Sequence, residues 1–214
     1  DSFLALDQMV QIARMKGLEG ICITDHDSMG LKEYAAEYSK DTGFPIFVGI
    51  EYYSLQGDIV AFGIEDYPTE RIPAQDFIDL VNAQAGVCFA AHPFRNNNRG
   101  LEENLRKVKG LHGLEVLNGS TSVEACQKAA RYAAELGLFT LGSSDCHVPE
   151  KVGVCATYFP EKFHTMEGFL DAFRKGQMKP AYYAGGKYHV LELKEQQKSK
   201  IPFTFYAFND RMYL

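Results

Sequence analysis

The feature that most constrains the fold is a repeated alternation of helical and strand-like segments. Apolar residues at helical spacing in residues 4–15 end at Gly17 and lead directly into the apolar run 20–24. Strand-like runs then recur at 45–50, 59–63, 87–91, 113–117 and 139–142, and helical patterns lie at 31–40, 74–85, 101–108, 123–136 and 166–174. Strands that alternate with helices favour parallel pairing. Two α/β architectures remain open on this pattern, a doubly wound open sheet and a closed barrel.

Length and charge limit the classes of protein to which the chain can belong. Its 214 residues are 46% hydrophobic, which is enough for one ordinary globular domain with a core. The formal net charge is -6 and no basic run is present, so we expect no bulk binding of nucleic acid. No apolar run reaches the length of a membrane-spanning helix, and we expect no membrane association.

Cysteine usage and composition indicate the compartment and the domain organisation. Five cysteines stand singly, without a C-x-x-C pair, and this pattern predicts free thiols in a reducing cytoplasm. One domain is expected over residues 1–180. Residues 181–214 form a C-terminal extension of unknown role, which is polar over 187–200 and rich in aromatic residues from 201 to 214.

Ionisable residues gather where four of the strand-like runs end. They are His26, Glu51, His92, Asp145 and His147. Because the carboxyl ends of parallel strands meet at one rim, we expect these side chains to lie together, although a single histidine at such a position is more often structural. Mixed imidazole and carboxylate ligands suit Zn, Mn or Fe, and a carboxylate can bridge two ions. The set therefore predicts a multinuclear hydrolytic centre.

Five segments, taken in order, resemble one known family. They are GLEGICITDHD (17–27), VGIEY (48–52), AAHPFR (90–95), GLEVLN (113–118) and GSSDCH (142–147). Their order and spacing over residues 1–180 are similar to those of the PHP family, named for polymerase and histidinol phosphatase. The resemblance implies a distorted (β/α)7 barrel that carries divalent metal ions at its rim. It also implies a hydrolase acting on phosphoric ester bonds.

The resemblance implies a role for each ionisable residue at the rim. Glu51 bridges two metal ions and Asp145 binds one of them. His26 and His147 bind another ion, which they share with Asp1. Together with His92, Glu51 and Asp145 form the implied catalytic set.

Three further positions are candidates for ligand or substrate contact. His92 is a further metal ligand or, alternatively, the acid that protonates the leaving group. Arg95 is placed to hold a phosphate through two hydrogen bonds, and Asn118 is placed to face the substrate. The loop 96–100 shapes the substrate or is simply a surface loop.

Two departures from the family pattern bear on the metal count and on the barrel. Members of the family open with a strand ending in His-x-His, whereas this sequence begins after that point, so the first barrel strand is absent from it. We expect the natural chain to extend upstream with such a strand. No histidine lies near Val60, where some members with three metal ions have one. Two ions of Zn, Mn or Fe are therefore expected, and a third is left open.

The favoured function is that of a stand-alone metal-dependent phosphoesterase. Its substrate would be a phosphorylated small molecule, a nucleotide or a short oligonucleotide end, attacked by a metal-activated water. Two alternatives remain open. The first is a non-catalytic or degenerate binding protein on the same fold, and the second is a polymerase-associated module of the exonuclease type.

Overall fold

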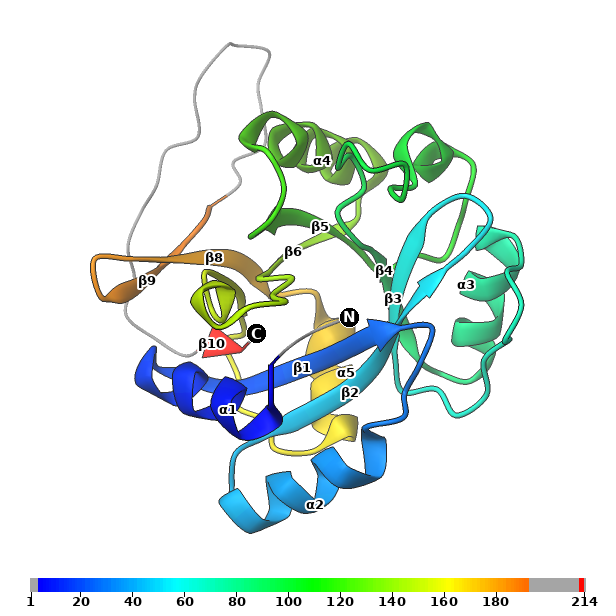
Figure 1. The fold of residues 1–214 in the computed structure, drawn as a ribbon. Helices are drawn as coiled ribbons and strands as arrows, with labels where there is room; N and C mark the ends of the chain where they lie inside the picture. Colours follow the sequence, from blue (N-terminus) through cyan, green and yellow to red (C-terminus); the bar gives the residue numbers. More distant parts are fainter. Residues whose placement is uncertain (1–3, 193–211, 214) are drawn as a thin grey trace.

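A curled mixed sheet with helices on its outer face forms the frame of the molecule (Figure 1). The computed structural model describes residues 4–192 and 212–213 of the chain. The strands are β1 (Leu18–His26), β2 (Ile46–Tyr53), β3 (Asp58–Phe62), β4 (Val87–Ala90), β5 (Gly113–Asn118), β6 (Phe139–Ser143), β7 (Cys155–Tyr158), β8 (Lys179–Ala184), β9 (Lys187–Val190) and β10 (Met212–Tyr213). The helices are α1 (Leu6–Met15), α2 (Lys32–Thr42), α3 (Ala74–Ala83), α4 (Val123–Leu136) and α5 (Met166–Lys175), with the 3-10 turns η1 (Glu102–Arg106) and η2 (Pro149–Lys151).

The strand order confirms the α/β class and corrects the expected direction of one strand. Within the described residues the order is β6-β5-β4-β3-β2-β1-β10-β7-β8-β9. Pairing is parallel between β1 and β2 and from β4 through β6, as expected, but β3 runs antiparallel to both β2 and β4. The expectation of parallel pairing was wrong here because residues 54–57 link β2 to β3 without a helix. As a result, β3 begins at the edge of the sheet where β2 ends.

Side-chain hydrogen bonds join β6 to β7, which are not neighbours in the hydrogen-bonded ladder. The Thr157 hydroxyl accepts the N–H of Gly142 at 3.1 Å and donates to its carbonyl at 2.7 Å. The Ser144 hydroxyl donates to the carbonyl of Cys155 at 2.6 Å and accepts its N–H at 3.4 Å. These bonds satisfy backbone groups that a neighbouring strand would otherwise satisfy, and they link the curled sheet between β6 and β7.

The inner face of the curl is apolar toward one end. Alternate residues of β2, β3 and β4 face inward, so Phe47, Phe62 and Phe89 share one buried cluster with Phe169 and Phe173 of α5. The rings of Phe47 and Phe169 stack with centroids 5.0 Å apart. Helix α5 thus covers this end of the curl, while α2, α3 and α4 lie outside it (Figure 1).

The remaining elements correct smaller expectations from the sequence. The helix expected at 101–108 is only the short turn η1, and β7, β8 and β9 were not anticipated. Strand β8 pairs antiparallel with β7. Within the described residues, no helix combines the length and the apolar composition needed to cross a bilayer.

Candidate metal centre

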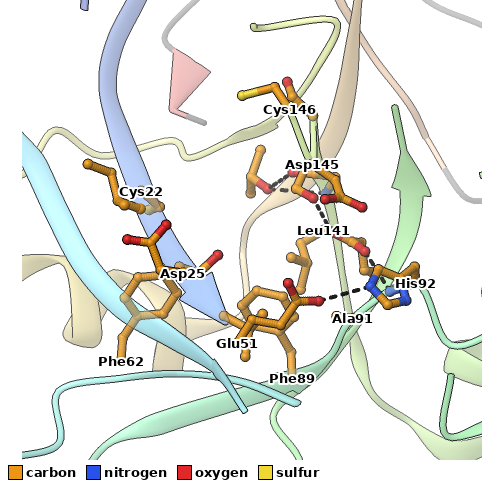
Figure 2. Close-up of a pocket in the computed structure, with 18 of the residues that line it drawn as sticks. Cys22, Asp25, Glu51, Phe62, Phe89, Ala91, His92, Leu141, Asp145 and Cys146 are labelled. Atoms are coloured by element: carbon orange, nitrogen blue, oxygen red, sulfur yellow. Dashed lines mark hydrogen bonds and ion pairs between the residues drawn. The ribbon is translucent and has the colours of Figure 1, made fainter. Parts of the chain in front are cut away.

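The inward-facing rows change from apolar to ionisable at the open edge of the curl, hereafter the rim. In β2 the row runs from Phe47 to Glu51, and in β3 it runs from Phe62 back to Asp58. Because β3 is antiparallel, both acids arrive at the same rim, where His92 follows the end of β4. Figure 2 shows Glu51 pointing toward His92, with Phe62 and Phe89 close by. Glu51 and His92 line a cavity of about 150 Å³ together with His26, Asp145 and His147.

Glu51 lies between two histidines at the rim. Its Oε1 is 2.9 Å from His92 Nε2, and its Oε2 is 3.2 Å from His26 Nδ1. Asp58 Oδ2 is 3.6 Å from the same His92 nitrogen, and the ligand atoms of Glu51, Asp58 and His92 all lie within 4.8 Å of one another. Two donor atoms that share one metal ion are separated by roughly 3.0–3.4 Å. The Glu51 contacts are therefore close to the geometry of a metal site, and the donor set suits Zn, Mn or Fe.

His92 is held firmly but keeps one unsatisfied nitrogen. Its backbone φ is 26°, and its backbone N–H donates to Glu115 Oε2 at 2.6 Å. The buried Nδ1 atom has no hydrogen-bond partner in the part of the chain that the structure describes, and a bound ligand or water commonly satisfies such an atom. Burial disfavours the imidazolium, but the hydrogen bond to Glu51 and the charges of Glu115 and Glu51 outweigh it, so the pKa of His92 is raised.

A second group of residues faces this one across the site. Asp145, with a backbone φ of 46°, follows β6 and contacts the Arg95 guanidinium. Arg95 Nη2 also donates to Asn118 Oδ1 at 2.6 Å, and its Nε donates to Thr121 Oγ1 at 3.1 Å. Burial would raise the pKa of Asp145, but the hydrogen bond and charge of Arg95 outweigh burial and lower it. This carboxylate is therefore kept ionised.

Glu115 connects the two groups from below the rim. Its carboxylate accepts the N–H of His92, the Nδ2 of Asn118 at 2.9 Å, and the hydroxyl of Ser143. The residue is buried, and burial raises the pKa of its carboxyl group. Glu115 thus fixes the positions of a candidate ligand and of a candidate substrate contact at the same time.

The structure brings most of the predicted site residues to the rim. His26, Glu51 and His92 form one group, and Arg95, Asn118 and Asp145 form the other. His147 lies between them, because its Nδ1 is 3.7 Å from Asp145 Oδ1 and its ring centroid is 6.3 Å from that of His26. Asp1, expected to share an ion with His26 and His147, lies outside the described residues.

Two residues of the site, Asp58 and Glu115, escaped the sequence analysis, and Arg99 entered it only as part of the loop 96–100. Asp58 stands at the start of β3, and the assumption of parallel strands directed attention to the other end of that run. Glu115 interrupts the apolar run of β5, which is a signal that could have been used, whereas nothing local distinguishes Arg99 from a solvated loop arginine.

Comparisons with known proteins support the family resemblance. Residues 123–178 match the family model described as PHP-associated, which confirms that the chain resembles PHP proteins. An uncharacterised protein of Methanocaldococcus jannaschii is 24% identical over 110 residues, which are 51% of this chain and 64% of that protein. The match thus spans less than two thirds of the relative's length.

Solved structures share the fold at low sequence identity. A protein of Bifidobacterium adolescentis, named as a candidate metal-dependent phosphoesterase, is 19% identical with a TM-score of 0.60, covering 70% of this chain and 84% of that one. An amidohydrolase of Chromobacterium violaceum, with bound sulfate and no metal, is 19% identical with a TM-score of 0.61, covering 81% and 93%. A lesion-specific endonuclease of Pyrococcus furiosus is 16% identical with a TM-score of 0.61, covering 84% and 54%. At these identities the likeness establishes the fold alone.

Proposed function

We propose that the chain is a metal-dependent phosphoesterase that hydrolyses a phosphomonoester or a nucleotide-type phosphate ester at the rim. The observation that carries the proposal is the Glu51 carboxylate, which lies within 3.2 Å of ring nitrogens of both His26 and His92. Arg95 contacts Asp145, which lines the same cavity, and from there it can reach an anionic substrate. The structural likeness to a candidate phosphoesterase and to an endonuclease supports the same reaction class.

The chain's own residues divide the work at this site. Glu51 and Asp145 would hold one metal ion, with His92 as a further ligand, and His26 with His147 would hold another. When bound, divalent metal ions supply an activated water and stabilise the charge that develops on the phosphoryl oxygens. The carboxylate of Glu115 keeps His92 and Asn118 in position through the two hydrogen bonds described above.

Arg95 is the proposed contact for the substrate phosphate. A guanidinium carries five N–H donors, and those of Arg95 are directed to Asp145, Asn118 and Thr121. These partners hold the planar group at the rim before an anion arrives, which reduces the entropy lost on binding. The sulfate bound to the Chromobacterium protein shows that a protein of this fold can hold a tetrahedral anion.

A non-catalytic binding protein is the second candidate function. It is favoured by one observation, namely that two carboxylates of the site, Asp58 and Asp145, each already have an arginine partner. A centre neutralised in this way can persist without metal. Metal content and turnover, measured on the same preparation, separate the two candidates.

The test combines elemental analysis of the purified chain with hydrolysis of p-nitrophenyl phosphate and bis-p-nitrophenyl phosphate in the presence of Mn²⁺. We expect two metal ions per chain and metal-dependent hydrolysis, both reduced in Glu51→Gln. Glu65→Gln is the matched control, because Glu65 is an exposed acid that, among the described residues, forms an ion pair only with Lys32. Metal binding without hydrolysis of either ester would favour the binding protein, and absence of both would refute the phosphoesterase.

A further inference from the structure

Arg99 lies inside the candidate metal centre, although it comes from the loop that follows β4. Its Nε donates to Asp58 Oδ2 at 2.7 Å, and its Nη2 donates to Asp58 Oδ1 at 2.8 Å. The same Nη2 lies 3.4 Å from His26 Nδ1. Both oxygens of one carboxylate in the Glu51–Asp58–His92 group are therefore engaged by a protein cation.

The backbone around Arg99 is shaped to keep it there. The N–H of Asp58 donates to the Arg99 carbonyl at 2.6 Å. A Cβ atom at Gly57, where φ is +150°, would lie 2.6 Å from the nitrogen of Leu101 and 2.8 Å from the oxygen of Arg99, so this close approach requires glycine. The guanidinium carbon also lies 4.4 Å from the centroid of the Tyr53 ring, which covers it.

Electrostatics make this guanidinium a competitor of a metal ion. Arginine stays protonated in proteins, so its charge cannot be removed when a second cation approaches. A metal ion bound to Asp58 would lie within roughly 5 Å of the guanidinium nitrogens, given metal–oxygen distances of about 2.0–2.2 Å. Two cations at that separation repel each other, and the carboxylate between them, that of Asp58, is fully buried, although the Arg99 side chain is 29% exposed.

We infer that Arg99 occupies, as a fixed protein cation, the position beside Asp58 that a metal ion would otherwise take. The centre is thereby limited to the ions held through Glu51 and Asp145, and Asp58 serves as the partner of Arg99 rather than as a ligand. This inference rests on the proposed metal-dependent function, because it concerns how many ions the centre accepts. It makes Arg99 a determinant of metal loading.

The test is a count of Mn²⁺ ions bound per chain, by calorimetric titration of metal-depleted protein and by elemental analysis after gel filtration. Arg99→Met removes the charge and keeps an apolar stem, and we expect it to bind one more ion than the wild type. Arg99→Lys keeps a charge and should bind the wild-type number. The double variant Asp58→Asn/Arg99→Met should also return to the wild-type number, because the freed carboxylate is gone.

Arg71→Met is the matched control, since the Arg71 guanidinium carbon lies 3.8 Å from the centroid of the same Tyr53 ring but forms no ion pair with a described carboxylate of the site. It should bind the wild-type number of ions. A folded Arg99→Met variant with an unchanged or lower count overturns the inference, while a metal-binding wild type leaves the proposed function standing. A wild type that binds no metal refutes the proposed function and the inference with it.

A second variant covers the case in which Arg99→Met does not fold. In Asp58→Asn the Arg99 charge remains beside His26 and the Glu51 carboxylate without its partner. We expect the affinity for Mn²⁺ to fall at least tenfold in this variant. An affinity equal to that of the wild type would overturn the inference on its own.

Discussion

Two arginine–carboxylate pairs stand in the candidate metal centre, and they differ in how tightly they are built. Arg99 holds both oxygens of Asp58, which has no exposed surface, and a backbone hydrogen bond fixes the same two residues. Arg95 contacts Asp145 through one nitrogen, and the Asp145 side chain is 13% exposed. The same two residue types therefore make a closed pair and an open pair within one site.

The electrostatic effects on the two carboxylates also differ. Burial raises the pKa of Asp58, even though Arg99 opposes the shift through a hydrogen bond. At Asp145 the hydrogen bond and charge of Arg95 outweigh burial, and the pKa is lowered. The Arg99 side chain is 29% exposed and that of Arg95 is 20% exposed, so exposure of the arginine does not separate the two pairs. The comparison teaches that the contacts made by the carboxylate separate them: Asp58 is held at both oxygens and through its backbone, whereas Arg95 holds Asp145 through one contact that a substrate phosphate can replace.

The largest expected effect is on stability, from breaking the closed pair in the absence of metal. Arg99→Met leaves the Asp58 carboxylate buried without its partner, and loss of one member of a buried ion pair costs about 3–5 kcal/mol. We expect this loss in the free energy of unfolding, measured by urea titration with EDTA present. Arg71→Met, the control on the same Tyr53 ring, should stay within about 0.5 kcal/mol of the wild type. Equal stabilities of the two variants would remove the distinction between the closed pair and an ordinary surface arginine.

The second effect is on activity, from breaking the open pair. Arg95→Met should lower kcat/KM for a phosphate ester about 100-fold, or about 2.7 kcal/mol of transition-state stabilisation, because a charged phosphate contact is lost. The free energy of unfolding should change less than in Arg99→Met. Arg106→Met is the matched control, since Arg106 pairs with the exposed acids Glu103 and Glu135, neither of which is a residue of the candidate site. A larger stability loss in Arg95→Met than in Arg99→Met would reverse the comparison.

How far each pair could be predicted from the sequence follows from topology. Asp145 and Arg95 follow β6 and β4, which both run parallel to β5, so the rule that the ends of parallel strands share a rim directs attention to both. Asp58 begins a strand whose direction is reversed by a short turn, and its partner Arg99 lies 41 residues further along. The apolar runs of β2, β3 and β4 were readable because these strands are buried on both faces.

The parts of the fold that could not be predicted share another physical cause. Strand β7 is four residues long, and part of its support comes from the Ser144 and Thr157 hydroxyls, which leave no periodic signal in the sequence. Similarly, Glu115 owes its role to three donors that come from different segments of the chain. Contacts of this kind are made only once distant segments have packed together.

The third prediction tests whether the close contact between Gly57 and the backbone of residues 99–101 holds Arg99 in the closed pair. Gly57→Ala places a Cβ atom against the backbone of residues 99–101 and strains a φ of +150°. We expect a stability loss of about 2 kcal/mol, smaller than that of Arg99→Met because the ion pair can partly re-form. Combining both substitutions in a double-mutant cycle should give a loss well below the sum of the two. Full additivity would show that Gly57 does not act through Arg99.

The smallest expected effect is on activity and again concerns the open pair. It comes from removing the Thr121 hydroxyl, which holds Arg95 in place before substrate binds. Thr121→Val keeps the shape of the side chain but removes the acceptor of the Arg95 Nε hydrogen bond and the donor to Asn118 Oδ1, which are both 3.1 Å long. One such bond contributes about 1 kcal/mol, so kcat/KM should fall about fivefold. Thr121→Ser restores the hydroxyl and should restore the rate, which a purely steric role of Thr121 would not allow. In an Arg95→Met background, Thr121→Val should have little further effect, because the guanidinium that the hydroxyl positions is already gone.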